Sequence, residues 1–208
     1  MRTCVLSTRR FWERDNILLR VSLLRPLCFE ILVGLQDWAT KSNQRKGKKM
    51  KLTIELVPST SWGNNLRSEA NLSKKEWDKL RKGCYEKAGH KCEICGGVGW
   101  RRYNGKPKSI VECHEIWSYD DRKKVQTLKG LIALCPLCHK AKHLGRTLSV
   151  EKPQSRDKVL IHILEQNEMT VDELEAYIVE VFQVHEERSR HQWTLDLSWL
   201  ESERQKDK

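Results

Sequence analysis

Two Cys-x-x-Cys pairs constrain the fold of this chain more than any other feature of its sequence. The first pair is Cys92 and Cys95, and the second is Cys135 and Cys138. Four thiolates at this spacing can surround one zinc ion tetrahedrally, at about 2.3 Å each. Four sulfur ligands leave no open coordination position, so the ion would be structural and any catalysis would need a second site. We therefore predict a structural Zn²⁺; the alternatives are reduced thiols that bind nothing, or a redox pair.

The remaining cysteines indicate the compartment. They are scattered along the chain at Cys4, Cys28, Cys84 and Cys113. This distribution is unlike a disulfide framework and favours a reducing environment. The apolar run at residues 17–35 is interrupted by Arg20, Arg25, Pro26 and Glu30. It therefore predicts neither a membrane span nor a signal peptide, and we expect a soluble cytoplasmic protein without a membrane partner.

The positive charge of the chain is unevenly distributed. The formal net charge is +11 over 208 residues, and residues 1–49 hold 11 basic and 4 acidic residues, which leaves +4 for the remainder. A positive balance favours a polyanionic partner, although a solvated charged surface is the ordinary explanation of 32% charged residues. The length predicts one compact domain with attachments. Residues 1–49 form a basic extension that either belongs to the protein or precedes a true start at Met50.

The apolar pattern on either side of the cysteines predicts an α+β fold. Residues 52–56 and residues 193–199 alternate apolar and polar side chains, so each is predicted as a strand. Neither has an adjacent partner, and we expect them to pair with each other as a small antiparallel strand pair. Helices are predicted after Ser73 and after Thr170, because each begins a capping box. Both helices would cover the apolar face of the strand pair.

Between the cysteine pairs, Asn104-Gly105 predicts the turn of a β-hairpin whose returning arm is residues 110–117. Residues 120–129 are polar and predicted as loop, and a helix is expected at residues 139–144. Cys84 is interpreted as a core residue, and three histidines are interpreted as ordinary helix-face or surface residues: His162, His185 and His191. The predicted divisions after the extension are a supporting strand and helix (50–90), a zinc core (91–146), C-terminal helices and a strand (147–200), and a mobile charged tail (201–208).

The segment from Lys91 to Gly145 resembles the zinc-knuckle branch of the HNH endonuclease superfamily. The likeness rests on the first cysteine pair, a hairpin with a histidine on its second strand, and the run Cys-x-x-Cys-His-x-x-x-His that ends at His143. It implies a ββα-metal, or treble-clef, core in which the cysteines hold zinc while strand and helix histidines bind a divalent ion, Mg²⁺ or Mn²⁺. The implied activity is phosphodiester hydrolysis in DNA, in which the ion polarises the phosphate and a strand histidine deprotonates water.

The resemblance implies catalytic roles for His114, Glu115 and His139. His139 and His143 match the metal-binding end, and their i, i+4 spacing places both imidazoles on one helix face. Alternatively, His139 only caps the knuckle and His143 is solvated. On the strand, two registers stay open: either His114 is a metal ligand and Glu115 replaces the base, or His114 is the base and Cys113 takes the ligand position. Strand alternation places His114 and Glu115 on opposite faces, so both cannot easily face one phosphate.

The asparagine that usually orients the base falls at Gly130, and the sequence has no asparagine between His114 and His139. Its role would pass to Gln126, Asp120 or Asp121. The alternative function is therefore a catalytically inactive, zinc-stabilised nucleic-acid-binding module. Double-stranded DNA is the expected partner in either case, contacted by basic residues near the site: Arg101, Arg102, Lys106, Lys108, Arg122, Lys123, Lys124, Lys140, Lys142 and Arg146.

Overall fold

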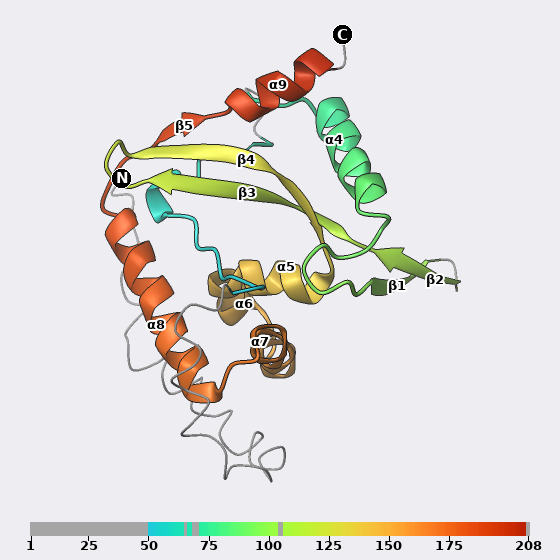
Figure 1. Cartoon of the computed structure of the whole chain (residues 1–208), viewed down its shortest axis with the longest axis vertical. Helices are drawn as coiled ribbons and strands as arrows, with labels where there is room; N and C mark the ends of the chain where they lie inside the picture. The colour runs from blue at the N-terminus through green and yellow to red at the C-terminus, as the bar shows by residue number, and fades with distance from the viewer. Residues whose placement is uncertain (1–49, 65, 68–70, 104–105, 207–208) are drawn as a thin grey trace, which may run out of the picture.

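The computed structural model describes residues 50–64, 66–67, 71–103 and 106–206, with only the backbone of residues 100–109. The basic extension at residues 1–49, with Cys4 and Cys28, lies outside them. The described chain is α+β (Figure 1). Its elements, in order, are η3 (Ser59–Ser61), α4 (Lys74–Lys87), β1 (Gly99–Tyr103), β2 (Lys106–Ile110), β3 (Glu112–Asp120), β4 (Val125–Leu134), α5 (Pro136–Lys142), α6 (Leu144–Val150), α7 (Pro153–Asn167), α8 (Val171–Arg188), β5 (Thr194–Asp196) and α9 (Ser198–Lys206).

The long antiparallel hairpin of β3 and β4 is the centre of the fold. Its register runs from Glu112 opposite Leu134 to Asp120 opposite Val125, with a bulge between Ile116 and Trp117. The Asp120 carboxylate accepts hydrogen bonds from the backbone N–H groups of Arg122 and Lys123 and closes the turn. The prediction of loop at residues 120–129 is therefore wrong for its second half. That half alternates partly exposed and buried positions along β4, up to the exposed Lys129, despite its polar composition.

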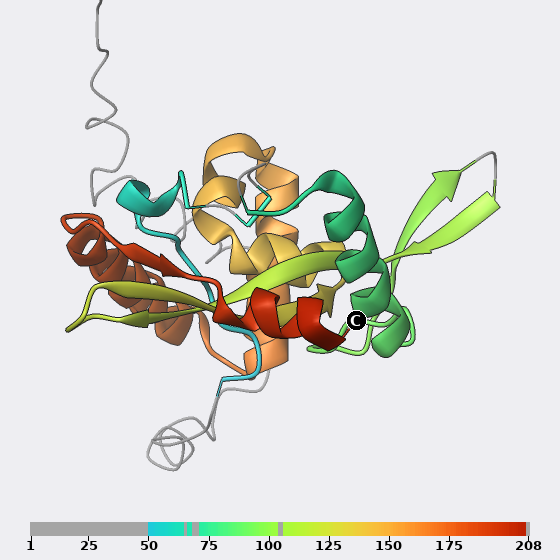
Figure 2. The ribbon, with the colours of Figure 1, turned by 90° about the horizontal axis from the view of Figure 1, so that it is seen from above.

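The expected hairpin at Asn104-Gly105 exists, but its returning arm is β2 and not residues 110–117. Strands β1 and β2 form a separate two-stranded sheet, in which Tyr103 pairs with Lys106 and Gly99 pairs with Ile110. The two turn residues themselves lie outside the described residues. Figure 2 shows this two-stranded ribbon projecting from the rest of the molecule. Residues 112–117 belong to β3, because their pairing partner is the long strand β4 rather than the short arm β1.

Two apolar cores stabilise the hairpin and its surroundings. The larger core joins residues 52–56, the first cysteine pair, the end of β4 and helices α5, α6, α7 and α8. The smaller core is built from Leu66, Leu72, Leu128 and Leu200, with side chains of α4 and α9 packed on it. In Figure 1, α4 and α9 lie on the opposite side of β3 and β4 from α5, α6 and α7. The metal-ligand candidates described below belong to the larger core's side of the hairpin.

Both predicted capping boxes are present. The Ser73 hydroxyl accepts from the Glu76 backbone N–H at the start of α4, and Thr170 does the same for Glu173 at the start of α8. Helix α4 ends before Gly89, whose φ of +58° suits glycine. The predicted helix near residue 139 begins earlier, at Pro136, and breaks at His143 before α6.

The prediction that residues 52–56 pair with residues 193–199 is wrong. Residues 52–56 are extended but form no strand ladder, and side chains from two helices take their backbone groups. The Asn167 amide bonds both the N–H and the C=O of Leu52, and the Tyr177 hydroxyl accepts from the Ile54 N–H. Helix α8 packs on this segment, whereas Trp77 of α4 packs in the smaller core, so the two helices do not cover one strand pair.

At the other end, only Thr194–Asp196 is a strand, and it pairs in parallel with β4. The expected antiparallel pair is therefore absent from the described residues. The Asp196 carboxylate accepts from the Ser198 N–H, which starts α9 in place of a continued strand. Helix α9 extends through most of the tail that was predicted to be mobile, and Arg204 donates hydrogen bonds to Glu76 and to the Asn71 carbonyl. Among the described helices, none has both the length and the apolar character that crossing a bilayer requires.

Candidate metal centres

The four predicted cysteine ligands converge on one point. The sulfur atoms of Cys92, Cys95, Cys135 and Cys138 all lie within 4.8 Å of one another. The first pair sits in a tight turn, where Gly96 has φ of +72° and its N–H donates to the Cys92 carbonyl at 2.9 Å. The second pair begins α5, where the Cys138 N–H points at the Cys135 sulfur at 3.5 Å. Local backbone geometry therefore directs both pairs toward one centre.

The chemistry of this cluster fits zinc. Hydrogen bonds from Cys135 and Cys138 lower the pKa of Cys92, whereas the hydrogen bond with Cys135 and burial raise the pKa of Cys138. The Cys92 thiol thus loses its proton more readily than the Cys138 thiol, because like charges this close repel. A dication surrounded by four sulfurs would remove that conflict, and four thiolates are the donors of structural zinc sites. Cys84 is outside the cluster and half-buried on α4, where it hydrogen-bonds Cys113.

A second cluster joins three histidines from β3 and from the end of α5. Ligand atoms of His114, His139 and His143 lie within 4.8 Å of one another, and Nδ1 of His114 is 3.2 Å from Nε2 of His143. His139 of α5 and His143 therefore lie together, although the helix that was predicted to carry both ends at Lys142. His114 is buried, whereas the His139 side chain is 25% exposed. The cluster is thus open to solvent on the His139 side.

Two carboxylates approach this cluster from its outer side. Glu55 Oε2 lies 3.1 Å from Nε2 of His114, and Glu112 Oε2 lies 2.5 Å from Nδ1 of His139. An ionised carboxylate only accepts, so each contacted nitrogen carries the proton and the other ring nitrogen keeps its lone pair. A histidine that donates its outer N–H to a carboxylate is the usual arrangement around a protein-bound metal.

The pKa values of two side chains at the cluster, His143 and Glu55, favour the binding of a cation. Burial lowers the pKa of His143 to about 3, so its imidazole is neutral at pH 7. Burial would raise the pKa of Glu55, but hydrogen bonds from His114 and Lys142 and the Lys142 charge outweigh this effect and lower it to about 2. A neutral His143 beside an ionised Glu55 suits a divalent ion, since imidazole nitrogens are common ligands of such ions.

In the structure, His114 lies at the histidine cluster without either of the residues, Cys113 or Glu115, that the two strand registers assign to it. His114 points into the histidine cluster, whereas the thiol of its neighbour Cys113 is hydrogen-bonded to the thiol of Cys84. Glu115 lies 3.6 Å from Arg67 in an ion pair, away from the histidines. Of the proposed catalytic residues, His114 and His139 are therefore brought together and Glu115 is not, because adjacent residues of a strand face opposite sides.

None of the expected substitutes for the orienting asparagine contacts His114. Asp120 closes the hairpin turn, Asp121 pairs with Arg188, and Gln126 is fully buried further along β4. A side chain at Gly130 would meet Trp199 of α9. The residue that bonds His114 is instead Glu55, 59 positions earlier in the chain.

Three residues near the clusters were missed by sequence reasoning. Glu112 had a usable signal, because it lies two positions before His114 on the same strand face. Glu55 had none, since its contact is not local. His162, interpreted as an ordinary helix histidine, has its Nε2 3.1 Å from the Cys138 sulfur, and burial lowers its pKa.

Comparison with protein-family models, with curated proteins and with solved structures gave no match to this chain. The geometry of the two clusters is therefore the basis of the functional proposal.

Proposed function

We propose that this chain is a metal-dependent nuclease of the HNH type, with a ββα-metal, treble-clef core that hydrolyses phosphodiester bonds in DNA. In this proposal the four cysteines hold a structural zinc. The ion used for catalysis is held by His114, His139 and His143. When bound, that ion would stabilise negative charge on the phosphate and lower the pKa of water.

One observation carries the proposal: three histidines from β3 and α5 converge within 4.8 Å, and two of them donate to carboxylates on their outer side. In a chance cluster of surface histidines, no carboxylate would be expected to hold each ring in one tautomer. The exposed side of His139 and Glu112 gives a substrate access to the cluster. Arg146 is exposed and its charge acts on His143, so it is placed to contact a phosphate.

The donor set bears on which ion is used. Mg²⁺ prefers oxygen ligands in octahedral geometry, whereas imidazoles favour later transition ions. With three imidazoles and phosphate oxygens as ligands, we expect Mn²⁺ to support cleavage better than Mg²⁺, and Co²⁺ or Ni²⁺ to bind more tightly than either.

A specific observation favours the second candidate function, the inactive nucleic-acid-binding module. Glu115 is ion-paired with Arg67 and cannot act as the base, and His114 faces the metal cluster. If every nearby base is committed to a ligand or a partner, water activation depends on the ion alone. The scaffold would then bind DNA without cleaving it.

Nicking of supercoiled plasmid by the zinc-loaded chain separates the two functions. We expect nicking with Mn²⁺, loss of at least a hundredfold in rate for His114→Ala, and little change for the surface control His191→Ala. Glu115→Gln should nick at close to the wild-type rate, since this side chain faces Arg67. DNA binding without nicking in any of these ions would support the inactive module.

A further inference from the structure

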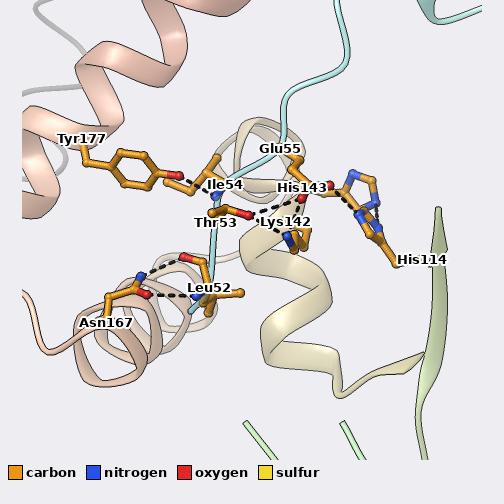
Figure 3. A network of polar contacts seen from close by, with 9 residues as sticks. All are labelled: Leu52, Thr53, Ile54, Glu55, His114, Lys142, His143, Asn167 and Tyr177. Carbon is orange, nitrogen blue, oxygen red and sulfur yellow. Dashed lines mark hydrogen bonds and ion pairs between the residues drawn. The ribbon is translucent and has the colours of Figure 1, made fainter. Parts of the chain in front are cut away.

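The extended segment at residues 52–56 passes between the α5–α6 junction and helices α7 and α8 (Figure 3). Leu52 and Ile54 are buried in the larger core. Between and after them, Thr53 and Glu55 face the other way and meet Lys142. The segment is therefore held in the core by Leu52 and Ile54, and it places the Glu55 carboxylate beside the histidine cluster.

The segment is fixed at each residue that leads to this carboxylate. Asn167 at the end of α7 bonds both backbone groups of Leu52, at 2.9 and 2.8 Å. The Tyr177 hydroxyl of α8 accepts from the Ile54 N–H at 2.9 Å, and the Lys142 carbonyl accepts from the Glu55 N–H at 2.9 Å. These hydrogen bonds, made with two side chains and with the backbone of α5, hold the segment in one register without a sheet.

The Glu55 carboxylate then divides its two oxygens between two buried partners. Oε1 accepts from the Lys142 ammonium, which is only 9% exposed, and Oε2 accepts from Nε2 of the His114 ring, which is 3% exposed. The first contact fixes the rotamer of Glu55. The second determines which nitrogen of His114 carries the proton, so Nδ1 is left with its lone pair toward His143.

We propose that Glu55 is the positioning residue of His114, supplied by the N-terminal segment and held in place by α7 and α8. The proposal rests on the three-histidine cluster binding a divalent ion, as in the proposed function. It adds that a part of the chain outside the zinc core determines the affinity of that cluster. The C-terminal helices are then components of the metal site and not only its support.

The first test reads the tautomer directly, with one zinc per chain, no second ion and no substrate. Long-range ¹H–¹⁵N spectra of the zinc-loaded chain identify the His114 ring by its loss in His114→Ala. We expect a protonated Nε2 and an unprotonated Nδ1 in wild type, and a mixture of tautomers in Glu55→Ala. Glu55→Gln keeps an acceptor oxygen and should preserve the wild-type pattern. An unchanged tautomer in Glu55→Ala would overturn the proposal.

The second test measures ion affinity in a calorimeter, by titrating Co²⁺ into chain that carries one zinc per molecule, so that the histidine cluster is empty at the start. Loss of an outer-shell partner typically costs about ten- to a hundredfold in metal affinity. We expect that loss for Glu55→Ala, a smaller loss for Glu55→Gln, and none for the matched surface control Glu187→Gln. Because Glu55→Ala leaves Lys142 buried without its partner, the double variant Glu55→Ala/Lys142→Met should show the same loss without that burial cost.

The outcomes separate this inference from the proposed function. If Glu55→Ala and the double variant bind Co²⁺ within twofold of wild type while His114→Ala does not bind, the histidine site stands and the role of Glu55 is wrong. If the wild type binds no second ion, the proposed function and this inference both fail.

Discussion

At the scale of single residues, the cysteines differ in role according to what their sulfur atoms face. Cys92, Cys95, Cys135 and Cys138 face one another. Cys84 faces Cys113 on the other side of the fold's centre. Because metal ligation contributes folding free energy directly, only the first group should link zinc to stability.

We predict that Cys135→Ser releases about one zinc per chain and lowers the melting temperature, because three thiolates cannot complete the tetrahedral site. Cys84→Ser should keep the wild-type zinc content. His139→Ala should also keep this zinc while weakening the histidine site. Zinc analysis of the purified variants, together with thermal melts, provides the measurement, and loss of zinc from His139→Ala would contradict the division into two metal centres.

His185 on α8 gives a pH prediction away from both clusters. Burial lowers its pKa, more than the hydrogen bond to the Val57 backbone raises it. The unfolded chain then takes up this proton first, so stability is fully present above pH 6.5 and falls as pH drops below it. The free energy of unfolding in urea should fall less between pH 7 and pH 5.5 in His185→Gln than in wild type. Equal falls in the two proteins would show that His185 is not held neutral.

At the scale of elements, the β3–β4 hairpin separates the cysteine and histidine clusters from the smaller core. Helix α9 contributes Leu200, which is 2% exposed, to that core, and α4 packs on it through Trp77 and Leu80. The C-terminal helix therefore stabilises the hairpin from the side opposite the larger core (Figure 1).

We predict that Leu200→Ala destabilises the chain by about 2–5 kcal/mol, the usual range for a buried leucine. Zinc content should stay at the wild-type value in the folded protein, because no metal-ligand candidate is in this core. Val184→Ala, at a position 43% exposed, is the control and should change stability little. Chemical denaturation checks the prediction, and equal effects of the two substitutions would contradict it.

At the scale of the whole molecule, the positive charge is not all available to a polyanion. Lys142 is buried against Glu55, and Lys140 pairs with Glu151. Arg146 beside His143 is exposed, and so is Arg122 at the far turn of the hairpin. Proximity to the histidine cluster and not simple charge should decide which arginine contacts DNA.

We predict that the logarithm of duplex-DNA affinity falls with the logarithm of salt concentration, by about 0.9 per neutralised phosphate. Arg146→Ala should reduce that slope by about 0.9, whereas Arg122→Ala should leave it nearly unchanged. Fluorescence anisotropy across a salt series measures both slopes. A slope near zero in wild type would mean that these charges are ordinary solvated surface.

Much of the fold could be read from local patterns. The capping boxes at Ser73 and Thr170 predicted α4 and α8 because the reciprocal bonds join residues three positions apart. The alternation at residues 52–56 predicted a strand with one buried face, of which the structure keeps only the buried Leu52 and Ile54. It could not reveal that Asn167 and Tyr177 would bond the backbone, because any acceptor brought close in space satisfies an N–H as well as a strand does.

The sequence by itself predicted that the four cysteines would gather at one point and that His139 and His143 would lie together, because Cys-x-x-Cys pairs and an i, i+4 spacing are local patterns. The tertiary structure alone decided which carboxylate bonds His114, where β5 pairs, and that Glu115 faces Arg67. Those contacts join segments far apart along the chain. Their geometry depends on how the hairpin and helices pack, and no local repeat of apolar and polar residues reports that packing.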